Sequence, residues 1–410
     1  MEPPVQQMLD AMRDGSMYLD PSAIWAALRE SAAMVHLPLA EGIWLCTRWA
    51  DCAALARDPR LSSVRAEKLV NRAPAEVREL MEPVAAFLAD TVLFMDPPRH
   101  ARIRKLMGRA FSPEVMDRMR LRMETLFDQM LEDWINSGEA DIMASLIHPF
   151  PALVIADMLG FPPDDWRQFL LWADALMRVI GNLEITAEEA RRAVPLVHEM
   201  LDYVRAAVDD RTRNRGSDLL SLLLGMEDGD VLDREEGVNQ AALLLFAGHE
   251  TTRNLIGGGL HLLLSSDGTT RRIPSDPVAL RLAIDELLRL ASPIQVVGRV
   301  VVEDFEYDGH SLQKGDSILL GWAAANRDPR KFADPGQILL ERRHNPHLAF
   351  GAGPHACLGM HLARIEAQIA FERIWQRLPD LRLVPDGTEW TANLFVRGPR
   401  KMEVAMAAAL

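Results

Sequence analysis

The 410-residue chain has little cysteine and little basic charge. Its three cysteines, Cys46, Cys52 and Cys357, include no pair with the two-residue spacing of a zinc or redox motif. A disulfide framework is therefore not expected, and we expect a reducing cytoplasm. No run of about 18 consecutive apolar residues occurs, which excludes a membrane-spanning helix. Lys and Arg number 45 against 59 Asp and Glu, giving a formal net charge of −14, so a nucleic-acid partner is a poor hypothesis.

The chain also lacks a Gly/Ser-rich linker, a low-complexity tract and an internal repeat. Its first 20 residues carry charges and prolines where a secretory signal would need an apolar run. Hydrophobic residues make up 49% and charged residues 25%, the balance of an ordinary globular protein. We therefore expect a well-packed single domain over residues 1–410, working as a monomer.

Helical periodicity dominates what is present. Apolar residues recur at three- and four-residue steps over 113–134, 164–180, 187–211 and 233–265. The last stretch opens on Asp233 and Glu236, spaced as a capping box. Strand-like alternation is confined to four pieces, 34–46, 296–307, 317–320 and 381–405. The sequence thus predicts a mainly α fold with small β-sheets.

The loop before the last helical stretch carries the most informative motif. Residues 350–359 read FGAGPHACLG, and the apolar positions after Cys357 follow helical spacing. A helix N-terminus favours a thiolate. Gly351, Gly353 and Gly359 let the backbone approach a large planar group closely. A lone cysteine after a glycine turn is more often a buried structural residue, so the decision rests on the whole spacing, F-x-x-G-x-H-x-C-x-G.

That spacing resembles the heme-binding loop of the cytochrome P450 family, in a bacterial form with His where Arg is common. The resemblance runs from about Pro21 to the C-terminus. It implies the family's triangular-prism fold, with heme b between the long central helix and the helix after the cysteine loop. It also implies that Cys357 is the axial thiolate ligand of the heme iron, which favours O–O cleavage. His355 would bind a heme propionate, and Phe350, Gly351 and Gly359 would line the cofactor.

A second match lies in the long helix. Ala247-Gly-His-Glu-Thr-Thr252 stands between strongly apolar runs, and buried polar groups there need a reason. Gly248 would leave a gap beside the backbone, and a Thr bonded to the preceding turn would distort the helix. The run resembles the family's oxygen-binding groove. The resemblance makes Ala247 and Gly248 cofactor contacts, and makes Glu250 and Thr251 the catalytic proton relay.

A third match, Glu286-Leu-Leu-Arg289, places opposite charges on one helix face, which alone would be a weak surface pair. It resembles the family's E-x-x-R motif, which is buried and bonded to a later Arg. Arg342 is the matching position. Ile338-Leu339 stand where the family usually has Phe-Asp. The implied role is structural support for the cysteine loop.

A fourth match begins at Asp96-Pro-Pro, which opens a helix with Asp96 as its expected cap. His100 and Arg104 share one face of that helix, and Arg102, Lys105 and Arg109 lie nearly opposite. The resemblance assigns His100, Arg104 and Arg299 to heme propionates. The opposite basic face suits an acidic redox protein, implied to be a ferredoxin with an NAD(P)H-dependent reductase, although a solvated face is the alternative.

Substrate contacts are placed by their position between these motifs. The candidates are mostly apolar: Phe87, Trp172, Leu243, Leu244, Ile294, Gln295, Val296, Leu394 and Phe395. Each residue type is more often core than pocket. Gln295 is the polar candidate. We therefore expect a bulky, largely apolar substrate of terpenoid, polyketide or fatty acyl type.

The resemblance implies a heme-thiolate monooxygenase. A peroxide-driven peroxygenase is a second hypothesis, which Glu250 and Thr251 oppose because similar peroxygenases carry Arg-Pro there. A third is an inert recruitment module for a carrier protein, which would be expected to lose the same two residues. Heme spectroscopy and NADH consumption with a ferredoxin pair would separate the three.

Overall fold

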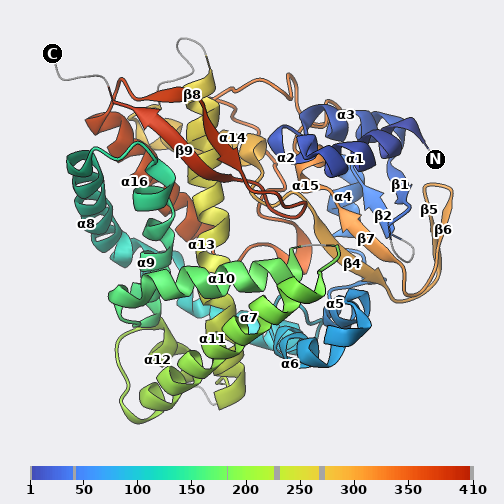
Figure 1. The fold of residues 1–410 in the computed structure, drawn as a ribbon, viewed down its shortest axis with the longest axis horizontal. Coiled ribbons are helices and arrows are strands. Elements are labelled where there is room, and N and C mark those ends of the chain that lie inside the picture. Colours follow the sequence, from blue (N-terminus) through green and yellow to red (C-terminus); the bar gives the residue numbers. More distant parts are fainter. Residues whose placement is uncertain (1, 40–42, 182, 226–230, 267–272, 407–410) are drawn as a thin grey trace. The chain divides into compact units, whose positions relative to one another are not determined.

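The computed structural model describes residues 2–39, 43–181, 183–225, 231–266 and 273–406. Helices predominate over small sheets, as expected from the periodicity (Figure 1). The chain forms two compact units. Unit 1 comprises 1–61, 121–148 and 251–410, and unit 2 comprises 62–120 and 149–250. The expectation of a single domain stays a prediction. In the described part of the chain, no helix is long and apolar enough to cross a membrane.

Unit 1 contains a five-stranded sheet of order β1-β2-β7-β4-β3. Its strands are β1 (Met34–Leu37), β2 (Ile43–Cys46), β7 (Ser317–Leu320), β4 (Val297–Val301) and β3 (Leu61–Ser62). β2 pairs parallel with β7, and β4 pairs antiparallel with β7. The strand expected over 34–46 is therefore a hairpin, with residues 40–42 outside the described residues. Two separate hairpins are β5 (Phe305–Tyr307) with β6 (His310–Leu312), and β8 (Arg382–Trp390) with β9 (Pro399–Ala405).

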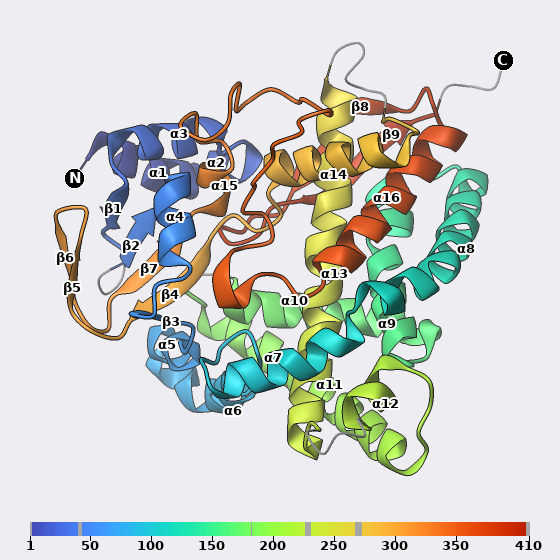
Figure 2. The same ribbon diagram turned by 180° about the vertical axis from the view of Figure 1, so that it is seen from behind.

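Unit 1 also contains helices. They are α1 (Pro3–Asp14), α2 (Ser16–Leu19), α3 (Ser22–Ser31), α4 (Trp49–Leu55), α14 (Pro277–Ala291), α15 (Trp322–Ala325) and α16 (Met360–Arg377), with most of α8 (Pro113–Ser137) and the C-terminal part of α13 (Arg234–Ser265). In that part of α13, a Cβ on Gly259 would lie 2.7 Å from Phe371 and 3.4 Å from Leu287. The glycine thus lets α13 pack closely against α14 and α16, which lie beside it in Figure 2.

Unit 2 is helical: α5 (Ala66–Arg72), α6 (Arg78–Ala89), α7 (Arg99–Ala110), α9 (Pro149–Leu159), α10 (Trp166–Ile180), α11 (Ala187–Arg213), α12 (Leu219–Leu224) and the N-terminal part of α13. Rings of α10 and α11 interlock, with Trp172 5.1 Å from Tyr203 and 5.7 Å from Phe169 between ring centroids. The capping box at the start of α13 is confirmed, because Glu236 N–H donates to Asp233 and Asp233 N–H donates to Glu236.

One expected cap is wrong. Helix α7 begins at Arg99, and the Asp96 carboxylate does not cap it. Instead, Asp96 accepts hydrogen bonds from the Ser62 hydroxyl at 2.5 Å and the Ser63 N–H at 2.9 Å. The two donors from a distant segment hold the carboxylate there, while the Asp96 carbonyl oxygen accepts the N–H of His100, the second residue of the helix.

Candidate functional site

The cysteine loop is fixed by backbone hydrogen bonds within unit 1. Cys357 N–H donates to the Phe350 carbonyl at 2.7 Å, and Ala356 N–H donates to Gly353. Gly351 and Gly353 both have φ of +71°, a conformation that favours glycine. Helix α16 begins three residues after Cys357. Residues 355–361 are all partly accessible, so Cys357, unlike Cys46 and Cys52, is not buried.

Gly353 and Gly359 have different surroundings. A Cβ on Gly353 would lie 2.6 Å from the carbonyl oxygen of Ala56, just after α4, so this glycine permits a close backbone contact. Gly359 has φ of −85°, and a Cβ there would meet nothing within 4 Å. Space beside Gly359, two residues after Cys357, therefore remains open. A flat group ligated by Cys357 fits that space.

Phe350 is held from α14 and α16. The Arg364 guanidinium lies 4.7 Å from its ring centroid, and the Arg364 Nε–H donates to Asp285 at 2.8 Å. His347 also contacts both Phe350 and Asp285. Burial alone would raise the pKa of Asp285, but the hydrogen bonds from His347 and the charge of Arg364 outweigh it and lower the pKa. Sequence reasoning missed this support, although Asp285 directly precedes the motif that was recognised.

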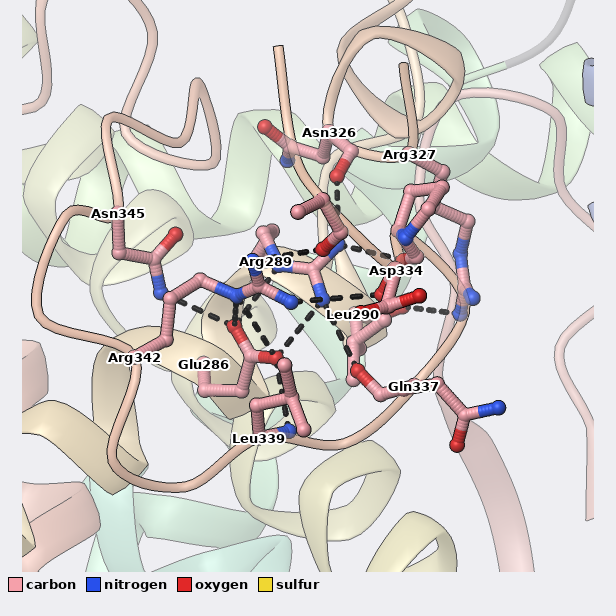
Figure 3. Close-up of polar contacts among 12 residues, drawn as sticks. Glu286, Arg289, Leu290, Asn326, Arg327, Asp334, Gln337, Leu339, Arg342 and Asn345 are labelled. Atoms are coloured by element: carbon pink, nitrogen blue, oxygen red, sulfur yellow. Dashed lines mark hydrogen bonds and ion pairs between the residues drawn. The ribbon is translucent and has the colours of Figure 1, made fainter. Parts of the chain in front are cut away.

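The Glu286 carboxylate is the shared acceptor at the centre of a buried ion network (Figure 3). It accepts from Arg289 Nε and Nη2, both at 2.8 Å, and from Arg342 Nε at 3.1 Å. Glu286 and Arg289 are both completely buried. Burial favours a higher pKa for Glu286, but the hydrogen bonds and charge of Arg289 outweigh it, so the pKa lies below its ordinary value. The structure thus brings together the three residues that the sequence assigned to this motif.

The departure at Ile338-Leu339 does not disturb this network, because Leu339 contributes its backbone N–H, 3.0 Å from Glu286. Asn326, which sequence reasoning also missed, extends the network to the loop. Its carbonyl oxygen accepts from Arg289, and its side-chain oxygen accepts the Leu348 N–H at 2.6 Å. An asparagine in a turn gives no sequence signal for such a role.

The middle of α13 has one open face. Ala247, Gly248 and Thr251 are partly accessible, whereas His249, Glu250 and Thr252 are buried. Positions 247, 248 and 251 share a helix face at i, i+1 and i+4. The expected gap at Gly248 is filled on its Cβ side, because Ile155 of α9 lies 3.0 Å from where that Cβ would be. The close approach of α9 is the physical reason for this glycine.

Thr252 has a partner that sequence reasoning missed. Glu366 of α16 is buried, and burial raises its pKa well above the ordinary value despite a hydrogen bond with Thr252. The shift favours the protonated, uncharged form of Glu366. The sequence carried a signal, since this acid interrupts the apolar stripe of Leu362, Ile365 and Ile369.

The basic candidates lie in both units. In unit 2, His100 is buried on α7, Arg104 is partly accessible, and Lys105 and Arg109 are exposed. Arg102, expected on the exposed basic face, forms an ion pair with Glu236 at the start of α13. In unit 1, Arg299 is a buried residue of β4, and His355 lies in the turn before Cys357.

The apolar candidates of unit 2 are core-like. Phe87, Leu243 and Leu244 are buried, and Trp172 belongs to the ring cluster of α10 and α11. In unit 1, the structure brings 294–296 and 394–396 together. Gln295 N–H donates to the Phe395 carbonyl at 2.8 Å, and residues Ile294 and Val396 form a β-bridge. Leu394 and Val296 are buried beside the partly accessible Ile294 and Phe395.

Gln295 is committed to contacts within the protein. Its side-chain oxygen accepts the Trp25 indole N–H at 3.1 Å, and its amide nitrogen donates to the Ser292 carbonyl at 2.6 Å. Gln295, Trp25 and Leu394 also line a cavity of about 10 Å³, roughly the space of one water molecule. Pockets for small-molecule ligands usually measure roughly 300–1,000 Å³, so this cavity is too small for a bulky substrate.

Comparisons with known proteins agree with one another. Residues 278–405 match the family model described as cytochrome P450. The chain is 35% identical over 369 residues to the polyketide biosynthesis cytochrome P450 PksS of Bacillus subtilis (strain 168), covering 89% of each chain. It is 34% identical to the cytochrome P450 monooxygenase PikC of Streptomyces venezuelae, covering 94% of this chain and 91% of that protein. Among solved structures, P450BioI in complex with an acyl carrier protein ligated to hexadec-9Z-enoic acid aligns with a TM-score of 0.87 at 28% identity, covering 96% of this chain and 100% of that one.

Proposed function

The chain belongs to the cytochrome P450 family and is a heme-thiolate monooxygenase, and on that premise we propose that it oxidises a bulky, largely apolar molecule of polyketide, fatty acyl or terpenoid type. The reaction would place one oxygen atom from O₂ in the product, with electrons from NAD(P)H through a ferredoxin reductase and a ferredoxin. The observation that carries the proposal is the cysteine loop, in which the partly accessible Cys357 lies two residues before a glycine with no neighbour on its Cβ side.

The residues fit heme b with a cysteine thiolate ligand. Cys357 is the matching ligand position, and the Phe350–Cys357 hydrogen bond holds its backbone. His355 and Arg299 supply hydrogen-bond donors in the same unit for carboxylates of the cofactor, and His100 and Arg104 are the further candidates. When bound, the heme supplies the activation of dioxygen for insertion into an unactivated bond.

The test of this assignment is spectroscopic. The reduced protein with carbon monoxide should show a thiolate-type Soret band, and Cys357→Ser should lose it. Cys52→Ser is the matched control, because it removes a buried thiol outside the loop and should keep the band. Retention of the band by Cys357→Ser would contradict the assignment.

Glu250 and Thr251 are proposed to deliver protons during the reaction. The open face of α13 supports a position for Thr251 beside the reacting molecules, and Glu250 supplies a buried carboxylate one residue before it, 3.9 Å from the ring of His249. Thr251→Ala should raise NADH consumption per product formed, whereas Thr251→Ser should not. Thr252→Ala is the neighbouring control, because Thr252 bonds to Glu366 instead. Equal NADH consumption per product formed in Thr251→Ala and the native protein would exclude a role of Thr251 in proton delivery.

The substrate class is supported by the partly accessible Ile294 and Phe395 and by the names of the relatives, which include a polyketide biosynthesis enzyme and a complex with an acylated carrier protein. A screen of macrolactones, free fatty acids, carrier-bound acyl thioesters and terpenes for the absorbance shift of a displaced iron-bound water would separate the classes. Binding confined to small polar molecules would overturn the proposal.

Electrons are proposed to enter at the basic face of α7. Lys105 and Arg109 are its exposed members, while the ion pair with Glu236 holds Arg102. Lys105→Glu and Arg109→Glu should slow turnover with an acidic ferredoxin, and added salt should slow the native enzyme. Arg102→Gln tests the third position without placing two carboxylates together. Unchanged turnover in all of these experiments would exclude the basic face of α7 as the site of electron entry. A cytoplasmic location and a monomeric state stay proposals, tested by cell fractionation and by size-exclusion chromatography.

A further inference from the structure

Two cysteines outside the heme site meet in the core of unit 1. Cys46 is the last residue of β2, and Cys52 lies in α4. Their sulfur atoms are 3.5 Å apart, and both residues are completely buried. The Cys52 thiol also lies 3.3 Å from the Cys46 carbonyl oxygen, as a hydrogen-bond donor. The two thiols are therefore in van der Waals contact although neither belongs to a recognisable sequence motif.

The backbone on both sides of this contact is held in place. The Cys46 carbonyl accepts the Gly321 N–H at 2.8 Å, and β2 is paired on both edges, with β1 and β7. At the start of α4, the Trp49 N–H donates to Asp328 at 2.9 Å. A disulfide bond is about 2.0 Å long, so the sulfurs would have to approach by about 1.5 Å. Side-chain rotation shared between the two residues can supply a movement of that size.

We propose that Cys46 and Cys52 form an oxidation site, a dithiol that a peroxide converts to an intramolecular disulfide. In the first step, one sulfur attacks a peroxide oxygen, the O–O bond breaks, and a sulfenic acid and water form. In the second step, the other sulfur attacks the sulfenic sulfur, the S–S bond forms and the S–O bond breaks, releasing a second water. Two thiols and one hydrogen peroxide thus give one disulfide and two waters, and the thiols lose two electrons to the peroxide.

The surroundings of the two thiols make their oxidation slow, but they favour reaction of the two thiols with each other. The hydrogen bond with Cys52 and the burial of the site raise the pKa of the Cys46 thiol, so the less reactive thiol form dominates. Once one sulfur is oxidised, its neighbour at 3.5 Å reacts sooner than any thiol from solution. The product would join β2 to α4. The far end of α4 leads to Ala56, which contacts Gly353 of the cysteine loop, so the cross-link lies on a helix that supports that loop.

The test counts thiols in the folded holoenzyme. Reduced protein is incubated with excess hydrogen peroxide, the peroxide is removed with catalase, and the protein is then denatured and alkylated with N-ethylmaleimide. Untreated protein should carry three alkyl groups, one on each cysteine. Treated protein should carry one, on Cys357.

Peptide mapping identifies the bond, because trypsin cleaves after Arg48, between the two cysteines. The disulfide should link the peptide of residues 30–48 to that of residues 49–57, and reduction should separate them. Cys46→Ala and Cys52→Ala are matched controls, in which the remaining thiol should give no linked peptide. The wild-type measurement stands on its own if either variant folds poorly.

Three results would overturn the proposal. One is retention of all three alkylatable thiols after treatment, and another is a bond that joins either cysteine to Cys357 or to a second molecule. The third is a link that forms only when denaturant is present during oxidation, because the native contact would then contribute nothing. None of these readouts depends on turnover, so the proposal stands or falls separately from the proposed function.

Discussion

Replacing Glu286 with Gln tests the energetic weight of the buried ion network. The carboxylate accepts from five N–H groups: Arg289 Nε and Nη2, Arg342 Nε, the Leu339 backbone and Asn345 Nδ2. Gln keeps the shape but turns one acceptor into a donor and leaves two guanidinium charges without their counter-charge. Removing one partner of a fully buried pair costs about 3–5 kcal/mol. The free energy of unfolding should fall by that amount.

The matched control is Glu30→Gln on the protein surface. Glu30 bonds to Arg330 at 2.8 Å, but both side chains are about half exposed, at 51% and 46%. Such pairs contribute about 0–1 kcal/mol. Urea unfolding of the two variants and the native protein measures both losses, and the heme content of each preparation reports on the cysteine loop. A loss at Glu286 no larger than that at Glu30 would refute the reasoning, as would full heme content despite the expected loss of stability.

Three further predictions concern single side chains. Burial, and then the charge of Arg397, lower the pKa of His261 from 6.5 to about 4. Between these pH values the unfolded chain binds a proton at His261 that the folded protein does not bind, so the folded protein loses stability as the pH falls from 6.5 to 4. The shift corresponds to up to about 3 kcal/mol, or about 2 kcal/mol allowing for the partial exposure of the ring, and urea unfolding should show a smaller loss in His261→Phe. Glu366 has a raised pKa, so its contribution to the free energy of unfolding falls as the pH rises above 4.5. Glu366→Gln should therefore match the thermal stability of the native protein at pH 4 and exceed it at pH 8. Equal thermal stability at pH 8 would contradict the raised pKa. Gly353→Ala should lower the free energy of unfolding by about 1–3 kcal/mol in thermal unfolding, because of its φ of +71° and the nearby Ala56 carbonyl. Gly359→Ala should leave folding unchanged but lower heme content. A destabilised Gly359→Ala beside an unaffected Gly353→Ala would exclude the assigned geometry.

The long helices and the cysteine loop could be predicted because their signals are local. Periodic apolar residues predicted α8, α10, α11 and α13 to within a few residues, and the glycine spacing around Cys357 predicted a loop followed by a helix. The partners of Glu286 were predicted through a motif resemblance rather than from spacing. The contact itself depends on a meander 53 residues or more along the chain, which no local pattern fixes.

The features that the sequence did not reveal are contacts between distant segments. Asp96 bonds to Ser62 and Ser63 instead of the helix next to it, because those donors are brought close only by folding. The contact of Cys46 with Cys52 depends on the angle between a strand and a short helix. The bond from Trp25 to Gln295 joins residues 270 apart in the chain. Composition and periodicity carry no record of such pairings.

The attachment of Gln295 has a consequence for changing the substrate range. Residues 294–296 and 394–396 are joined by a backbone hydrogen bond and a β-bridge, and Trp25 and Ser292 hold the side chain between them. A larger or smaller residue at Ile294 would therefore displace its bridge partner Val396 as well, and the reverse. Substitutions in contact couple by about 0.5–3 kcal/mol. Variants at these two positions should be non-additive, and libraries that vary them one at a time would miss the combinations that the shared backbone permits.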